Sequence, residues 1–160
     1  MNPPHQTVMD ALEACMHDLH VTAAAVVDDH WQQIKDMEKQ TQSWSDKSTL
    51  VLAAYRKGNH LQLKWIGTKW YGVKDARRQV KISIPRAKSE LTYTMAKLRP
   101  WTKEWEAPIV EETERKITSI RKEAHFVVRS IMAIRNAALT EQNCAIESNG
   151  IDIEPESDPS

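Results

Sequence analysis

The sequence predicts an α+β fold, with two long antiparallel helices and a small antiparallel β-sheet of three or four strands inserted between them. Apolar residues recur every three or four positions over 7–42 and again over 101–139, which is the spacing of one helix face. Over 49–85 apolar and polar residues alternate instead, which is typical of strands with one buried face. Residues 1–142 are therefore expected to form a single domain.

The first helix is predicted from Thr7 to about Gln42. Thr7 and Asp10 resemble a short capping box, and Pro3-Pro4 closes off anything upstream. At about 35 residues the helix is roughly 50 Å long, too long for a small core to cover unless another element runs beside it. Its apolar stripe contains Val8, Leu12, Cys15, Leu19, Ala23, Val26, His30, Ile34 and Met37.

Residues 101–139 supply a matching second helix. Pro108 falls in its first turns, where proline costs least, so the helix is expected to start or kink near Glu104–Pro108. We expect the two helices to pack antiparallel within one chain, but an intermolecular bundle would bury the same stripes, so a homodimer remains open. The stripe contains Trp105, Ile109, Thr113, Ile117, Ile120, Ala124, Val127, Ile131, Ile134 and Ala138.

The central segment reads as an antiparallel meander. Strands are expected over 49–55, 60–66 and 79–84, and Gly67-Thr68 is interpreted as a tight turn. Residues 89–99 are ambiguous, since they favour either a further strand or a short helix at 94–98. Three tryptophans are expected to fill the junction between sheet and helices, namely Trp65, Trp101 and Trp105.

Charge is strongly segregated along a chain whose net charge is zero. Residues 1–45 carry seven acids and two bases, 46–103 carry fourteen bases and three acids, and 104–160 carry twelve acids and six bases. Such asymmetry indicates a polyanion or an acidic protein as partner. Residues 143–160, with five acids and two prolines, are expected to be a disordered acidic tail.

Clustered lysines and arginines on a small sheet can neutralise several phosphates. The alternative is that they are ordinary solvated charges, and charge alone does not choose DNA over RNA. Trp70 and Tyr71, flanked by glycines, either stack on bases or pack in the core. The predicted contact set is Lys57, Lys64, Lys69, Trp70, Lys74, Arg77, Arg78, Lys81, Arg86 and Lys88.

The sequence shows no sign of catalytic chemistry. There is no Gly-rich phosphate loop and no Cys-x-x-Cys. Cys15, His17, His20 and His30 lack a second ligand pair, so they are interpreted as helix-surface side chains and no metal or other cofactor is expected. With no membrane span, secretory signal or disulfide framework in view, we expect a cytoplasmic protein without a small-molecule substrate.

Three stretches together resemble the MobI family of conjugative transfer proteins. They are His60 to Tyr71, with Leu63-Lys64-Trp65 and Trp70-Tyr71; Lys81 to Arg86; and Trp105 to Lys122, with Glu111–Glu114 and Ile120-Arg121. The resemblance covers about residues 50–135. It implies a non-catalytic auxiliary factor that binds double-stranded DNA at the origin of transfer and works beside a separate relaxase.

Two other functions fit the same sequence. One is a helical dimer or adaptor whose basic sheet docks an acidic protein. The other is a nuclease or relaxase, which would nick supercoiled DNA with a metal ion.

Overall fold

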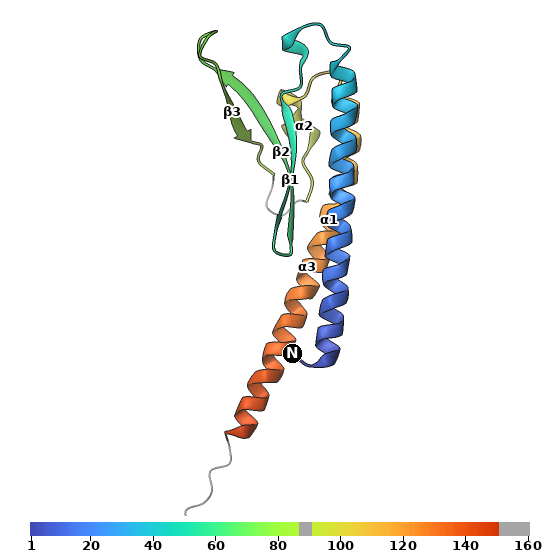
Figure 1. Cartoon of the computed structure of the whole chain (residues 1–160), viewed down its shortest axis with the longest axis vertical. Coiled ribbons are helices and arrows are strands. Elements are labelled where there is room, and N and C mark those ends of the chain that lie inside the picture. Colours follow the sequence, from blue (N-terminus) through green and yellow to red (C-terminus); the bar gives the residue numbers. More distant parts are fainter. Residues whose placement is uncertain (87–90, 151–160) are drawn as a thin grey trace, which may run out of the picture.

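The computed structural model describes residues 1–86 and 91–150, and it confirms the α+β fold. Two long helices, α1 (Pro3–Glu38) and α3 (Ala107–Asn149), run antiparallel and form a rod (Figure 1). Asn2, before α1, donates from its amide to both carboxylate oxygens of Glu141, late in α3, over 2.7 and 2.8 Å. The sheet lies along the upper half of the rod, where β1 contacts α1 and β2 contacts α3.

Both ends of α1 differ from the prediction of 7–42. The helix begins at Pro3, because the Asn2 side chain accepts from His5 N over 2.9 Å and the two prolines occupy positions where no backbone donor is required. It ends at Glu38, where Thr41 Oγ1 donates to the Glu38 carbonyl over 2.8 Å. Asn2 rather than Thr7 is thus the cap.

The bounds 101–139 predicted for the second helix differ from the structure at both ends, although the start expected near Glu104–Pro108 is confirmed. Trp101 belongs to a separate short turn, η2 (Arg99–Trp101), and α3 starts at Ala107 with Pro108 in its first turn. At the other end α3 continues to Asn149, because no glycine or proline interrupts it before Gly150. Residues 143–149 are therefore helical, and the rest of the predicted acidic tail, 151–160, lies outside the described residues.

The sheet has three strands in the order β1 (Leu50–Lys57), β2 (His60–Tyr71) and β3 (Arg78–Ser83). All neighbours are antiparallel, with Leu52 opposite Trp65 and Gly67 opposite Ile82. Gly67-Thr68 is not the predicted turn, since β2 runs straight through it. A Cβ at Gly67 would overlap the ring of Trp101, so glycine is needed here for close packing rather than for a turn.

The core lies between the sheet, the middle of α1 and the first half of α3. The stripe of α3 is largely as predicted, but α1 buries Met9 and Met16 where Val8 and Cys15 were expected. The ambiguous segment forms the short helix α2 (Met95–Leu98). Another short turn, η1 (Trp44–Asp46), links α1 to β1. Over the described residues, no helix contains an apolar stretch long enough to cross a lipid bilayer.

Candidate nucleic-acid interface

Five cations and one tryptophan of the predicted contact set gather where β2 turns into β3, and we call this group the basic end. All six side chains are exposed. In Figure 1 this part of the sheet reaches the upper end of the molecule, away from the two helices. The basic end consists of Lys69, Trp70, Lys74, Arg77, Arg78 and Lys81.

The loop over 72–77 has a defined shape. Gly72 has a φ of 104°, and a Cβ at this position would lie 2.6 Å from the carbonyl oxygen of Ala76. The Ala76 amide donates to the Val73 carbonyl over 2.8 Å, which closes a tight turn. Because the loop folds back on itself, Lys74 and Arg77 are held next to the strand ends.

Strand register assigns the side chains to faces. Residues directly opposite in antiparallel strands share a face, and successive residues alternate. Lys81 lies opposite Thr68, which places it on the face of Trp70, whereas Arg78 lies opposite Tyr71, on the face of Lys69. The basic end therefore presents cations on both faces of the sheet and on the loop.

The cations of the sheet form no ion pair among the described residues, although one acidic residue, Asp75, lies in the loop between Lys74 and Arg77. Among residues 1–86 and 91–150, every ion pair lies on α1 or α3 or joins their ends, and none includes a cation of the sheet. The basic end and its loop therefore carry five cations against one carboxylate, and none of the five cations is ion-paired within the described part of the chain. A polyanion would meet these cations without first displacing a paired carboxylate.

Four predicted residues lie apart from the basic end. Lys57 is at the β1–β2 hairpin tip, at the opposite end of the sheet, and Lys64 is exposed in mid-strand. Arg86 lies with its guanidinium 5.8 Å from the centroid of the Tyr93 ring. Lys88 lies outside the described residues. The ten predicted residues are therefore not one compact site.

A cavity of about 410 Å³ between β2 and α3 carries some of the remaining positive charge. Its described lining residues include Lys64, Arg86 and Arg129, as well as Arg121, whose charge is paired with that of Glu114, and none of the described lining residues is acidic. Its floor is partly apolar, with Ala124 among the residues. The cavity extends the basic surface from the sheet toward α3.

A buried ion pair holds the sheet to α3. The carboxylate of Glu114 and the guanidinium of Arg121 lie 2.6 Å apart, and both side chains are almost fully buried. Glu114 also accepts from Trp65 Nε1 and from the Tyr93 amide, both over 2.7 Å. We call these residues, with Leu63 and Leu91 described next, the Glu114–Arg121 network.

Arg121 also occupies an open strand edge. β3 pairs with β2 only from Ile66 onward, so the first half of β2 lacks a strand on that side within the described residues. There Arg121 donates from Nε and Nη2 to the Leu63 carbonyl over 3.1 and 2.9 Å, and from Nη1 to the Leu91 carbonyl over 3.1 Å. These bonds fix the orientation of the sheet, and hence of the basic end.

The sequence prediction missed this network. Glu114 and Arg121 were noted within the stretches that resemble the MobI family. The available signal was their position: both are next to apolar-stripe residues of α3, where an unpaired charge would be costly.

His30 is a buried side chain and not the surface histidine that was predicted. Its Nδ1 lies 2.9 Å from Thr113 Oγ1, and its ring centroid lies 5.2 Å from that of Trp65. Burial lowers the pKa of His30 to about 4, against the opposing charge of Asp29. Within the described ranges, no three histidine, cysteine or acidic side chains are grouped so that they could hold a metal ion.

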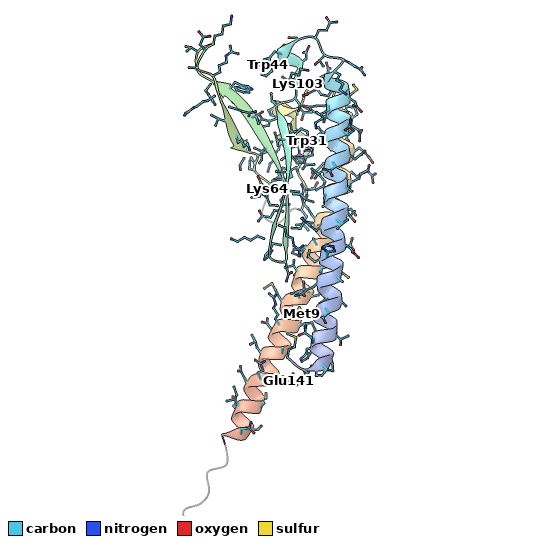
Figure 2. The ribbon with its side chains drawn as sticks, viewed as in Figure 1. Met9, Trp31, Trp44, Lys64, Lys103 and Glu141 are labelled. Carbon is cyan, nitrogen blue, oxygen red and sulfur yellow. The ribbon has the colours of Figure 1, made fainter. Side chains whose placement is uncertain are left out.

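Trp44 is the exposed aromatic residue that sequence reasoning did not consider. It is 67 % exposed, and its ring centroid lies 6.0 Å from that of Trp70, which is 45 % exposed. Figure 2 shows Trp44 at the same end of the molecule as Lys103, far from Glu141. Of the three tryptophans expected in the core, Trp65 is fully buried, whereas Trp101 and Trp105 are only partly buried.

A family model described as MobI protein matches residues 19–135. The chain belongs to the MobI family. The match spans most of α1, the whole sheet and α3 as far as Arg135, so it includes the basic end and the Glu114–Arg121 network. Membership makes the chain a mobilisation protein of conjugative transfer. No curated protein and no solved structure matches it.

The residues that resemble the MobI family in the sequence meet in the structure. Leu63, Trp65, Glu114 and Arg121 come from two of the three resembling stretches, and all belong to the Glu114–Arg121 network. These four residues of the resemblance therefore build the fold. The fold in turn positions the exposed cations of the sheet.

Proposed function

We propose that this MobI protein is a non-catalytic DNA-binding factor that recognises double-stranded DNA at the origin of transfer and assists a separate relaxase. The observation that carries the proposal is the basic end: five exposed cations that form no ion pair over residues 1–86 and 91–150, on the β2–β3 strand pair and its loop. A two-stranded ribbon of this kind fits the major groove, where arginines contact guanine edges. Lys57, Lys64 and Arg86 extend the phosphate contacts, and Lys88 is included in the proposed set.

The test is fluorescence anisotropy on origin-of-transfer duplexes and scrambled duplexes across a salt series. Each phosphate contact contributes about 0.9 to the slope of log affinity against log salt. The variant Arg77→Ala/Arg78→Ala/Lys81→Ala is therefore expected to lose up to about 3 from that slope. Preference for the origin sequence would support recognition in addition to phosphate binding.

The matched control is Arg115→Ala/Lys116→Ala/Lys122→Ala, which removes the same charge from α3. It is expected to bind DNA with an unchanged slope. Equal losses in the two variants would mean that only net charge matters, and absence of binding at low salt would refute the proposal.

Assistance to a relaxase is tested by nicking of supercoiled origin DNA. We expect the wild type to increase relaxase-dependent nicking and the sheet variant to lose that effect. Nicking by the chain alone in the presence of Mg²⁺ would favour a nuclease instead.

A second candidate function, a homodimer or adaptor, is favoured by one specific observation. Met132, Leu139 and Ile146 recur every seven residues on α3, and each is more than half exposed. Such spacing is suited to pairing with another helix. A mass that rises with concentration, together with binding of polyglutamate as tight as that of DNA, would favour this reading.

A further inference from the structure

Two exposed tryptophans from different elements meet beside the basic end. Trp44 comes from η1 and Trp70 from the last residues of β2, and their rings meet edge to face at an interplanar angle of 60°. Each keeps a large part of its surface in water, whereas Trp65 on the same strand is fully buried. Exposed apolar surface of this size marks an interaction site when it is gathered in one place.

The backbone that carries Trp44 is fixed. Trp105 Nε1 donates to the Asp46 carbonyl over 2.8 Å, and the Ser48 amide donates to a Glu38 carboxylate oxygen over 2.8 Å. Lys47 Nζ donates to the Glu38 carbonyl over 2.9 Å. These bonds connect η1 to the end of α1 and to Trp105, two residues before α3, so the backbone that carries Trp44 is held in place.

The surroundings of the two rings are basic and aromatic. Lys81 lies on the same face of the sheet as Trp70, while Lys69 and Tyr71, which is 49 % exposed, flank Trp70 along β2 on the opposite face. The loop cations Lys74 and Arg77 come next along the chain. Flat ring faces beside phosphate-binding cations are the combination that proteins use for single-stranded nucleic acid.

In an intact duplex the flat faces of the bases are covered by their neighbours, so a tryptophan ring reaches only base edges and the backbone. We propose that Trp44 and Trp70 form a stacking site for unpaired bases, so that this end of the sheet takes a single-stranded or locally opened stretch of DNA. The inference rests on the proposed DNA binding and adds that the bound DNA is single-stranded or locally opened. Stacking on one ring typically changes affinity by about fivefold or more.

The experiment compares a labelled 20-nucleotide thymidine strand with a duplex of equal length, by anisotropy and by quenching of tryptophan fluorescence. Trp44→Ala/Trp70→Ala is expected to weaken single-strand binding at least about fivefold per ring that stacks, and to weaken duplex binding, where Trp70 reaches only base edges and the backbone, by a smaller factor. Trp44→Phe/Trp70→Phe, which keeps a flat ring, is expected to retain most of the affinity.

The matched control is Phe126→Ala, because Phe126 is an equally exposed aromatic side chain (65 %) on α3. It is expected to bind both strands as the wild type does, and circular dichroism confirms that each variant is folded. Unchanged single-strand binding in the alanine variant, or an equal loss for both DNA forms, would overturn the stacking site while leaving duplex binding intact. If the wild-type protein bound neither the single strand nor the duplex, the proposed function would be overturned as well.

Discussion

The Glu114–Arg121 network and the basic end hold charge in opposite physical situations. In the network the two charges are buried, 2.6 Å apart, and bonded to an indole and three backbone groups. At the basic end five cations are exposed, and none of them belongs to an ion pair among the described residues. The first arrangement fixes the fold, and the second leaves charge available to a ligand.

This difference shows that the number of charged residues in a segment does not by itself identify a binding surface in this chain. A buried charge is costly unless it is paired and hydrogen-bonded, so its neighbours are dictated by the fold. An exposed charge contributes little to stability and is free to be positioned for a partner. Substitutions should therefore separate the two regions clearly.

The largest expected effect is from Glu114→Ala. Because it leaves the Arg121 guanidinium buried without its counter-charge, the free energy of unfolding should fall by about 3–5 kcal/mol in urea titrations. Glu112→Ala, which breaks an exposed pair with Arg115, is the control and should change stability little. The double variant Glu114→Leu/Arg121→Leu should recover part of the loss, and a Glu114→Ala chain as stable as the control would contradict the network.

Acid should weaken the same region through His30. Above about pH 6.5, His30 is neutral in both the folded and the unfolded chain. Between about pH 6.5 and pH 4, His30 binds a proton in the unfolded chain but stays neutral in the folded chain. Stability should therefore be lost as pH falls from 6.5 to 4, by up to about 3 kcal/mol.

Urea titrations at several pH values check this expectation. His30→Gln should start less stable, because it disturbs the contact with Thr113, but should show a flatter profile between pH 6.5 and 4. His125→Gln, at an exposed position, should keep the wild-type profile. If the His30 variant has the same pH profile as the wild type, another group causes the acid effect.

A smaller loss is expected at the contact between β2 and Trp101. Gly67→Ala places a Cβ in the Trp101 ring and should cost about 1–3 kcal/mol of unfolding free energy. Adding Trp101→Leu should relieve part of this cost. Gly150→Ala is the control, since its Cβ would meet nothing closer than 3.5 Å. Additive effects of the Gly67 and Trp101 changes would show that the two residues are not in contact.

The smallest effect on stability is expected at the basic end. Arg77→Ala/Arg78→Ala/Lys81→Ala removes exposed side chains and should change unfolding free energy by no more than about 0.5 kcal/mol per residue. The same variant should lose DNA affinity. A large loss of stability would mean that these cations have a structural role, and the contrast with Glu114 would no longer hold.

Periodic patterns predicted the two helices and the strands well, because each residue there is placed by its own neighbours in the sequence. The errors arose where distant residues decide. Gly67 was interpreted as a turn because the ring it accommodates, Trp101, comes 34 positions later. The shift from Val8 and Cys15 to Met9 and Met16 follows from adjacent apolar residues that fit the spacing equally well.

The sequence predicted which residues contact nucleic acid, but not which of them lie together on one surface. Alternation and charge identified the cations, but the strand register and the loop decide which of them lie together. Trp44 was overlooked because it stands outside the basic segment, and only the fold brings it beside Trp70. Arg121 was not assigned to the fold because its partners come from β2, from the segment before α2 and from α3.

The length of α3 can be compared with the rise of duplex DNA. Its 43 residues span about 65 Å, the rise of about 19 base pairs of duplex DNA, or nearly two helical turns. The basic end lies at the upper end of the molecule in Figure 1, and the C-terminal end of α3 lies at the opposite end of the rod. If the sheet binds DNA as proposed, a protein that contacts the C-terminal end of α3 would lie about 65 Å along the helix axis from the start of α3.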